Sequence, residues 1–196
     1  MKESFVFLAE GFEEVEALTA VDVLRRAGMP VRTVSITSNP IVTGAHGIAM
    51  KADALYDATL FTDPAWLILP GGLPGANNLH DFSPLIGLLH RQVESEHGRI
   101  AAICAAPALV LGLEGLLKGH KATCYPGFEK DLEGAEYIDT PVVVDRKFVL
   151  GNGPASAMKW ALAIVESELG EEKSFAVAAG MLLYPKSDKN LENIFG

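Results

Sequence analysis

The chain has 196 residues, of which 49% are hydrophobic and 21% are charged. A chain of this length fits one domain with a core large enough to be stable without disulfides. The formal net charge of −9 argues against nucleic acid and anionic membrane surfaces as partners, and two cysteines give no disulfide framework.

We expect no targeting or membrane segment. No apolar stretch approaches the roughly 18 residues that a transmembrane helix needs. The first apolar run starts at Phe5, which leaves no room for a signal peptide. Because low cysteine content also suits a reducing compartment, the sequence predicts a cytoplasmic protein. Its single domain is expected over residues 1–185, followed by a polar tail over residues 186–196.

Continuous apolar runs alternate with runs of helical period along the chain. Strands are expected at 5–9, 31–36, 66–69, 100–103 and 121–124, and hairpins at 41–50 and 142–150. Helices are expected at 13–27, 85–94, 107–113, 155–169 and 172–183. This alternation predicts an α/β domain with a mostly parallel sheet covered on both faces. Functional loops should then lie at the carboxyl ends of strands, after Ala9, Leu69 and Ile103.

Cys104 is the strongest candidate for a functional residue. The strand over 100–103 ends directly at this cysteine, and small residues surround it. A sharp strand-to-helix turn needs small neighbours and presents its central side chain as a nucleophile elbow does. The helix start favours a thiolate, so we expect an exposed sulfur and a pKa well below that of a free thiol. The alternative is a small core residue, because free cysteines are often buried.

Four carboxylates follow the first strand, at Glu10, Glu13, Glu14 and Glu16. Charge complementarity at a helix N-terminus accounts for Glu13 and Glu14. Glu16 lies one turn after Glu13, among Val15, Ala17 and Ala20. If this face points inward, burial raises the pKa of Glu16 so that it is partly protonated near neutral pH. It could then donate to the cysteine sulfur or act as a general base, whereas the alternative is a solvated helix face.

Two glycines, Gly71 and Gly72, follow the strand over 66–69. Their N–H groups could form an oxyanion hole beside Cys104, or the pair could be a plain turn. None of the five histidines is adjacent to Cys104, although His46 on the first hairpin could overhang a site. We predict no metal because no pair of ligands has metal-binding spacing, and no cofactor because no phosphate loop or dinucleotide fingerprint is present.

Several stretches together resemble the ThiJ/PfpI superfamily, most closely the branch that contains the parkinsonism-linked protein deglycase and bacterial YajL. The matching stretches are AEGFEEVE at 9–16, VDVLRRAG at 21–28, LPGG at 69–72, AAICAAP at 101–107, GP at 153–154 and ALAIVE at 161–166. Their order and spacing are highly specific, and they cover nearly the whole chain.

The resemblance implies a flavodoxin-like three-layer sandwich, a homodimer and no need for a cofactor. It implies that Cys104 is the reactive cysteine and that Glu16 hydrogen-bonds its sulfur. Backbone amides on the oxyanion side correspond to Gly71, Gly72 or Ala105. The expected site-lining residues are Glu13, His46, Tyr125, Asn152 and Pro154.

The implied activity is that of a glyoxalase or deglycase acting on small reactive carbonyls or glycated proteins. The alternative is a non-enzymatic sensor of oxidative stress, or a chaperone, in which Cys104 oxidises to a sulfenic or sulfinic acid. A PfpI-type cysteine peptidase or amidase is less favoured, because Ala105 stands where those members carry a histidine. Tyr125 stands before Pro126 where the deglycase subfamily often has a histidine, so no Cys–His dyad is inherited. Cys124 is expected in the core.

Overall fold

A computed structural model describes residues 1–183 of the chain. The strands are β1 (Ser4–Leu8), β2 (Val31–Ser35), β3 (Ile41–Thr43), β4 (Ala49–Lys51), β5 (Ala54–Leu55), β6 (Trp66–Leu69), β7 (Arg99–Ile103), β8 (Lys121–Ala122), β9 (Glu136–Tyr137), β10 (Val142–Asp145) and β11 (Phe148–Gly151). The helices are α1 (Glu14–Arg26), α2 (Gly75–Asp81), α3 (Ser83–Glu94), α4 (Ala157–Leu169) and α5 (Glu171–Gly180), with short helical turns η1 (Ala58–Leu60), η2 (Pro107–Gly112), η3 (Glu129–Asp131) and η4 (Pro154–Ser156). The predicted tail over 186–196 lies outside the described residues.

Seven strands form the central sheet in the order β10-β11-β7-β6-β1-β2-β5. Every neighbouring pair is parallel except the β10–β11 hairpin, which is antiparallel. The predicted mostly parallel α/β architecture is therefore confirmed. β3 and β4 form the first predicted hairpin as a separate antiparallel ribbon.

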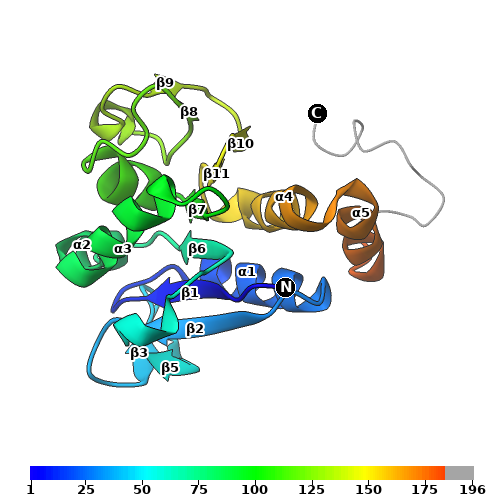
Figure 1. The fold of residues 1–196 in the computed structure, drawn as a ribbon, viewed down its shortest axis with the longest axis horizontal. Helices are drawn as coiled ribbons and strands as arrows, with labels where there is room; N and C mark the ends of the chain where they lie inside the picture. The colour runs from blue at the N-terminus through cyan, green and yellow to red at the C-terminus, as the bar shows by residue number, and fades with distance from the viewer. Residues whose placement is uncertain (184–196) are drawn as a thin grey trace.

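Helices cover both faces of the sheet, because its central strands are apolar on both faces. In β1, Val6 and Leu8 belong to the core beneath α1, α4 and α5, whereas Phe5 and Phe7 belong to the core beneath α2, α3 and η2. Figure 1 shows α2 and α3 on one side of the strands and α4 and α5 on the other. These three layers match the expected sandwich.

Sequence periodicity did not reveal α2. Its segment, Gly-Ala-Asn-Asn-Leu-His-Asp, reads as a loop because it carries few helix formers. The position of α2 depends on packing. A Cβ atom at Gly75 would lie 2.6 Å from the Gly11 carbonyl oxygen, so the helix starts directly against the loop after β1. The strand predicted over 121–124 contains only the two residues of β8, and the helix predicted after Cys104 forms as the π-helical turn η2. Among residues 1–183, every helix is too short or too polar to span a bilayer.

Candidate active site

Cys104 occupies a strained turn at the carboxyl end of β7. Its φ is 65°, in the left-handed region that non-glycine residues rarely adopt. Its N–H donates to the Gly151 carbonyl at 2.9 Å, and its carbonyl accepts the Tyr125 N–H at 2.8 Å. Strain of this kind, about 1–3 kcal/mol, persists only where the surroundings hold it. Both flanking segments therefore fix the sharp turn that the sequence predicted.

The Cys104 side chain lies deeper than expected. The residue is only 9% exposed, so the prediction of an exposed sulfur is wrong. The backbone N–H groups of Gly72 and Ala105 face the sulfur and lower the pKa of the thiol, although burial outweighs them. Donors placed in this way stabilise negative charge on the sulfur or on an oxygen attached beside it.

Glu16 lies in the first turn of α1 with a side chain that is fully buried. One carboxylate oxygen, Oε2, accepts the Gly71 N–H at 2.7 Å, while Oε1 is buried without completing a hydrogen bond. The carboxyl group also interacts with the Cys104 thiol. Because desolvation penalises the charged form, the pKa of Glu16 rises to about 7. Glu16 thus faces inward rather than toward solvent, and its pKa shifts in the direction that the predicted partial protonation requires.

The pKa of the Cys104 thiol moves in the direction opposite to the sequence-based prediction. Burial, followed by the charge of the facing Glu16 carboxylate, raises the pKa of Cys104 to about 12. The thiol therefore does not ionise on its own near neutral pH. The two groups titrate as a pair, and once Glu16 is ionised the remaining proton stays on the sulfur. Such a pair can move a proton from sulfur to carboxylate during a reaction.

Gly71 and Gly72 contribute in different ways. A Cβ atom at Gly71 would lie 2.6 Å from the Cys104 Cβ and 2.9 Å from Glu16 Oε2, so a glycine is required where these two side chains meet. Since the Gly71 N–H is bonded to Glu16, it is not free to hold a substrate oxyanion as the sequence suggested. The amides directed at the sulfur are those of Gly72 and Ala105.

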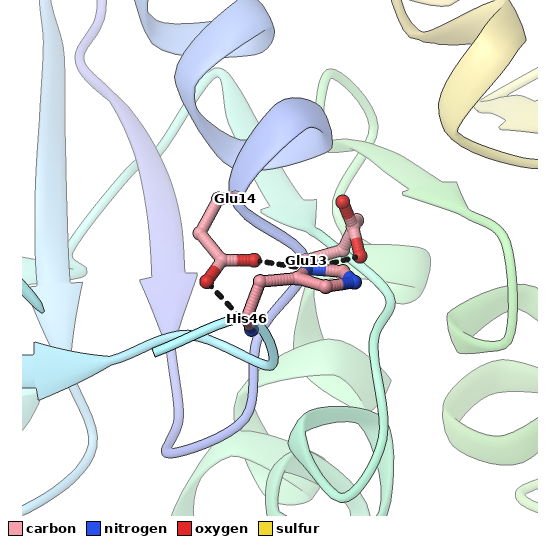
Figure 2. A group of neighbouring side chains, drawn as sticks. All are labelled: Glu13, Glu14 and His46. Atoms are coloured by element: carbon pink, nitrogen blue, oxygen red, sulfur yellow. Dashed lines mark hydrogen bonds and ion pairs between the residues drawn. The ribbon is translucent and has the colours of Figure 1, made fainter. Parts of the chain in front are cut away.

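His46 binds the acidic start of α1. Its ring Nδ1 lies 2.9 Å from Glu14 Oε2 and 3.5 Å from Glu13 Oε2. Figure 2 shows how the three side chains meet. Glu14 Oε1 also accepts the backbone N–H groups of His46 at 2.8 Å and Ile48 at 3.3 Å. Sequence reasoning missed this role of Glu14, because its donors come from a hairpin more than thirty residues away. The Glu13 N–H donates to the Gly71 carbonyl, which joins this cluster to the loop beside Cys104.

The remaining predicted site-lining residues lie on loops that flank the Cys104 turn. Tyr125 is half-exposed, and its ring lies 3.4 Å from the position of a Cβ at Gly153. Asn152 follows β11, and its Oδ1 accepts the Ser156 hydroxyl at 2.7 Å, so its side chain is bonded within its own loop. Pro154 begins η4 on the same loop. Cys124 is fully buried in the core beneath α2 and α3, which confirms its expected place.

Comparison with known proteins places these features in a family. The model of the DJ-1/PfpI family matches residues 2–167. The chain is 39% identical to Protein DJ-1 homolog B of Arabidopsis thaliana over 94% of its own length and 42% of that protein. It is 38% identical to Protein dj-1beta of Drosophila melanogaster, covering 93% of the chain and 97% of the relative. Deglycase PH1704 of Pyrococcus horikoshii is 34% identical over 78% of the chain and 90% of the relative.

Solved structures show the same fold. The structure described as Toxoplasma gondii DJ-1, oxidized, has a TM-score of 0.89 and 36% identity, covering 94% of this chain and all of that one. The structure of Drosophila melanogaster DJ-1beta has a TM-score of 0.87 and 36% identity, and the match covers 92% of this chain and 97% of that one. The chain spans less than half the length of the two Arabidopsis relatives, which are therefore longer proteins. The matches support a DJ-1-like function.

Proposed function

The chain belongs to the DJ-1/PfpI family, and on that premise we propose that it is a cofactor-independent enzyme of the glyoxalase or deglycase type. Its substrates are small reactive carbonyls or their adducts on proteins. The observation that carries the proposal is the pairing of Cys104, on a strained turn, with the fully buried carboxyl group of Glu16. The deglycase name of the Pyrococcus relative supports an enzymatic role.

The first step is attack of Cys104 on an aldehyde carbon. The Glu16 carboxylate accepts the thiol proton as the sulfur forms a bond to that carbon. The carbonyl electron pair moves to oxygen, and the proton now on Glu16 passes to it, which yields a neutral hemithioacetal. A base with a pKa of about 7 suits this exchange, because it is both available and reprotonated near neutral pH.

With a dicarbonyl such as methylglyoxal, a second proton transfer completes the reaction. Glu16 removes the proton from the hemithioacetal carbon and returns it to the neighbouring carbonyl carbon through an enediol. The result is a thioester of lactate, which water hydrolyses to lactate while the Cys104 thiol is restored. The amides of Gly72 and Ala105 stabilise the negative oxygen in the attack and hydrolysis steps.

A redox sensor is the second candidate function. One peroxide molecule converts the thiol into a sulfenic acid and a second converts it into a sulfinic acid, with one water released each time. The observation that favours this function is Glu16 Oε1, which is buried without a completed hydrogen bond and can donate to a sulfinate oxygen when protonated. Both functions use the same cysteine.

We also propose that the chain forms a homodimer. Val15 and Leu18 on α1 and Ile48 next to β4 are exposed apolar side chains, which suits a contact between copies. Light scattering coupled to size exclusion should give twice the chain mass. A Leu18→Lys variant that remained a dimer would place the contact elsewhere.

The cytoplasm remains our proposed location. Both cysteines are free thiols in the structure. Free thiols suit a reducing compartment. Imaging of the full-length protein in its own cells tests this placement.

The function is tested with methylglyoxal in the absence of glutathione. Lactate is measured for the unaltered protein, for Cys104→Ser, and for Cys124→Ser as the control for a buried thiol outside the site. We expect lactate from the unaltered protein and the control but not from Cys104→Ser. Equal lactate from Cys104→Ser would overturn the proposal. Absence of lactate together with selective oxidation of Cys104 at low peroxide would establish the sensor instead.

A further inference from the structure

Three potential metal ligands converge where the hairpin of β3 and β4 meets the start of α1. Glu13, Glu14 and His46 each offer a ligand atom, and these atoms lie within 4.8 Å of one another. In Figure 2 the His46 ring faces both carboxylates, which come from a different element. The sequence predicted no metal because these residues lack local ligand spacing, and only the fold brings position 46 to positions 13 and 14.

The cluster carries more negative charge than its own residues neutralise. Glu13 and Glu14 are both buried, and in the described part of the chain neither forms an ion pair with a lysine or an arginine. His46 is their shared ionic partner and supplies at most one positive charge. The Glu13 carboxylate completes no hydrogen bond among the described residues, and it points at the His46 Nδ1 from 3.5 Å. Two carboxylates beside a single imidazole leave an excess of negative charge, which favours a bound cation.

The geometry leaves one ligand atom of each residue available. Glu14 Oε1 is held by the backbone N–H groups of His46 and Ile48, so Oε2, which faces the His46 ring, is the oxygen that can reach a cation. In a tetrahedral site, metal–ligand bonds of about 2.0–2.2 Å place neighbouring ligand atoms about 3.3–3.6 Å apart. The separation of 3.5 Å from Nδ1 to Glu13 Oε2 lies in this range, and the separation of 2.9 Å from Nδ1 to Glu14 Oε2 needs to widen by less than about 1 Å.

The site is also fixed in place. A Cβ atom at Gly44 would lie 2.3 Å from the Glu14 carboxyl carbon, so only glycine lets the hairpin approach this closely. Backbone donors that orient a ligating carboxylate are the outer shell typical of metal sites.

We propose that Glu13, Glu14 and His46 form a binding site for a divalent transition-metal cation. One imidazole nitrogen and two carboxylate oxygens suit zinc or a neighbouring first-row metal, with water in the remaining position. A divalent cation balances the charge of the two carboxylates. This proposal is independent of the proposed function, because Cys104 and Glu16 are not ligands of the site.

Zinc titration followed by calorimetry tests the site. Every sample carries Cys104→Ser, so that the thiol cannot contribute a ligand. His46→Gln and Glu13→Gln remove one ligand each, and His97→Gln is the matched control because His97 is exposed far from the cluster in sequence. The hairpin anchor Glu14 is left intact. Cobalt(II) replaces zinc in a parallel series, since its visible absorption reports protein ligands directly.

We expect one zinc ion per chain in the Cys104→Ser protein and in the His97→Gln control. The affinity should fall by more than about tenfold in His46→Gln and Glu13→Gln, because even loss of an outer-shell partner costs that much. Zinc should also raise the melting temperature of the control but not of the two ligand variants. Absence of zinc binding in the Cys104→Ser protein, or equal affinity in all variants, would overturn the proposal.

Discussion

Two glutamates in the first turn of α1 are both buried, yet their environments drive their ionisation in opposite directions. Glu14 accepts two backbone N–H groups and contacts the His46 ring, and these donors lower its pKa despite burial. Glu16 accepts a single N–H from Gly71 and faces a thiol, so desolvation dominates and its pKa rises to about 7. The direction of each shift therefore follows from the balance between desolvation, which is larger at Glu16, and the donors around the carboxyl group, which are more numerous at Glu14.

Glu14 and Glu16 consequently have different roles. At Glu14 a stable negative charge ties the hairpin of β3 and β4 to α1. At Glu16 a charge that is costly at neutral pH is retained beside Cys104. The carboxylate that anchors the hairpin and the one that faces the Cys104 thiol thus lie two positions apart in sequence and face different elements.

The largest expected effect comes from removing the unfavourable charge at Glu16. The pKa of Glu16 is higher in the folded state than its ordinary value of 4.5, so its effect on folding is absent below pH 4.5, becomes unfavourable as the pH rises from there and reaches its full cost above pH about 7. Glu16→Gln should therefore raise the free energy of unfolding by about 3 kcal/mol at pH 8, with the gain lost at pH 4. Urea unfolding at both pH values measures this. A variant destabilised at pH 8 would show that the charge is compensated.

The matched change at Glu14 should have the opposite sign. Glu14→Gln keeps one oxygen for the backbone donors but loses a charged acceptor, which should lower the free energy of unfolding by about 1–2 kcal/mol at pH 8. Because its pKa is lowered on folding, the loss should disappear as the pH falls toward acid. Glu10→Gln is the control, since Glu10 is exposed and accepts one bond from Thr43. Equal losses of unfolding free energy in Glu10→Gln and Glu14→Gln would contradict the claim that the charge of Glu14 anchors the hairpin.

The smallest effect is expected at His46. Its side chain is 68% exposed, and the backbone N–H rather than the ring provides the hydrogen bond to Glu14 Oε1. Contact with Glu14 raises the pKa of His46, so its contribution is present below pH 6.5 and fades as the pH rises through the higher folded value. His46→Gln should change the melting temperature slightly at pH 6 and not at pH 9. A large loss at pH 9 would mean that the ring itself holds the hairpin.

The fold and the central pair were predictable from sequence because their signals are local. Continuous apolar runs marked β1, β6 and β7, and the strand-to-helix break marked Cys104. The segment of α2 lacked such a signal, since its helix depends on packing against Gly11.

The electrostatics of the site were less predictable. Periodicity placed Glu16 on a plausible inward face, but the pKa of Cys104 depends on how deeply the fold buries it and on the opposing carboxylate. The contacts of His46 with Glu13 and Glu14 join two elements that are distant in sequence, so no spacing rule reveals them. Sequence patterns thus singled out Cys104 and Glu16, whereas the directions of their pKa shifts depend on the three-dimensional arrangement.

The most direct test of the account is the pH dependence of Cys104 alkylation by iodoacetamide, with and without Glu16→Gln. Cys124→Ala in both proteins leaves Cys104 as the single thiol. We predict a rate that rises through an inflection near pH 7 in the presence of Glu16, because the carboxylate that accepts the thiol proton forms there. Glu16→Gln should lose this inflection. Identical profiles for the two proteins would contradict the claim that Cys104 and Glu16 act as a unit.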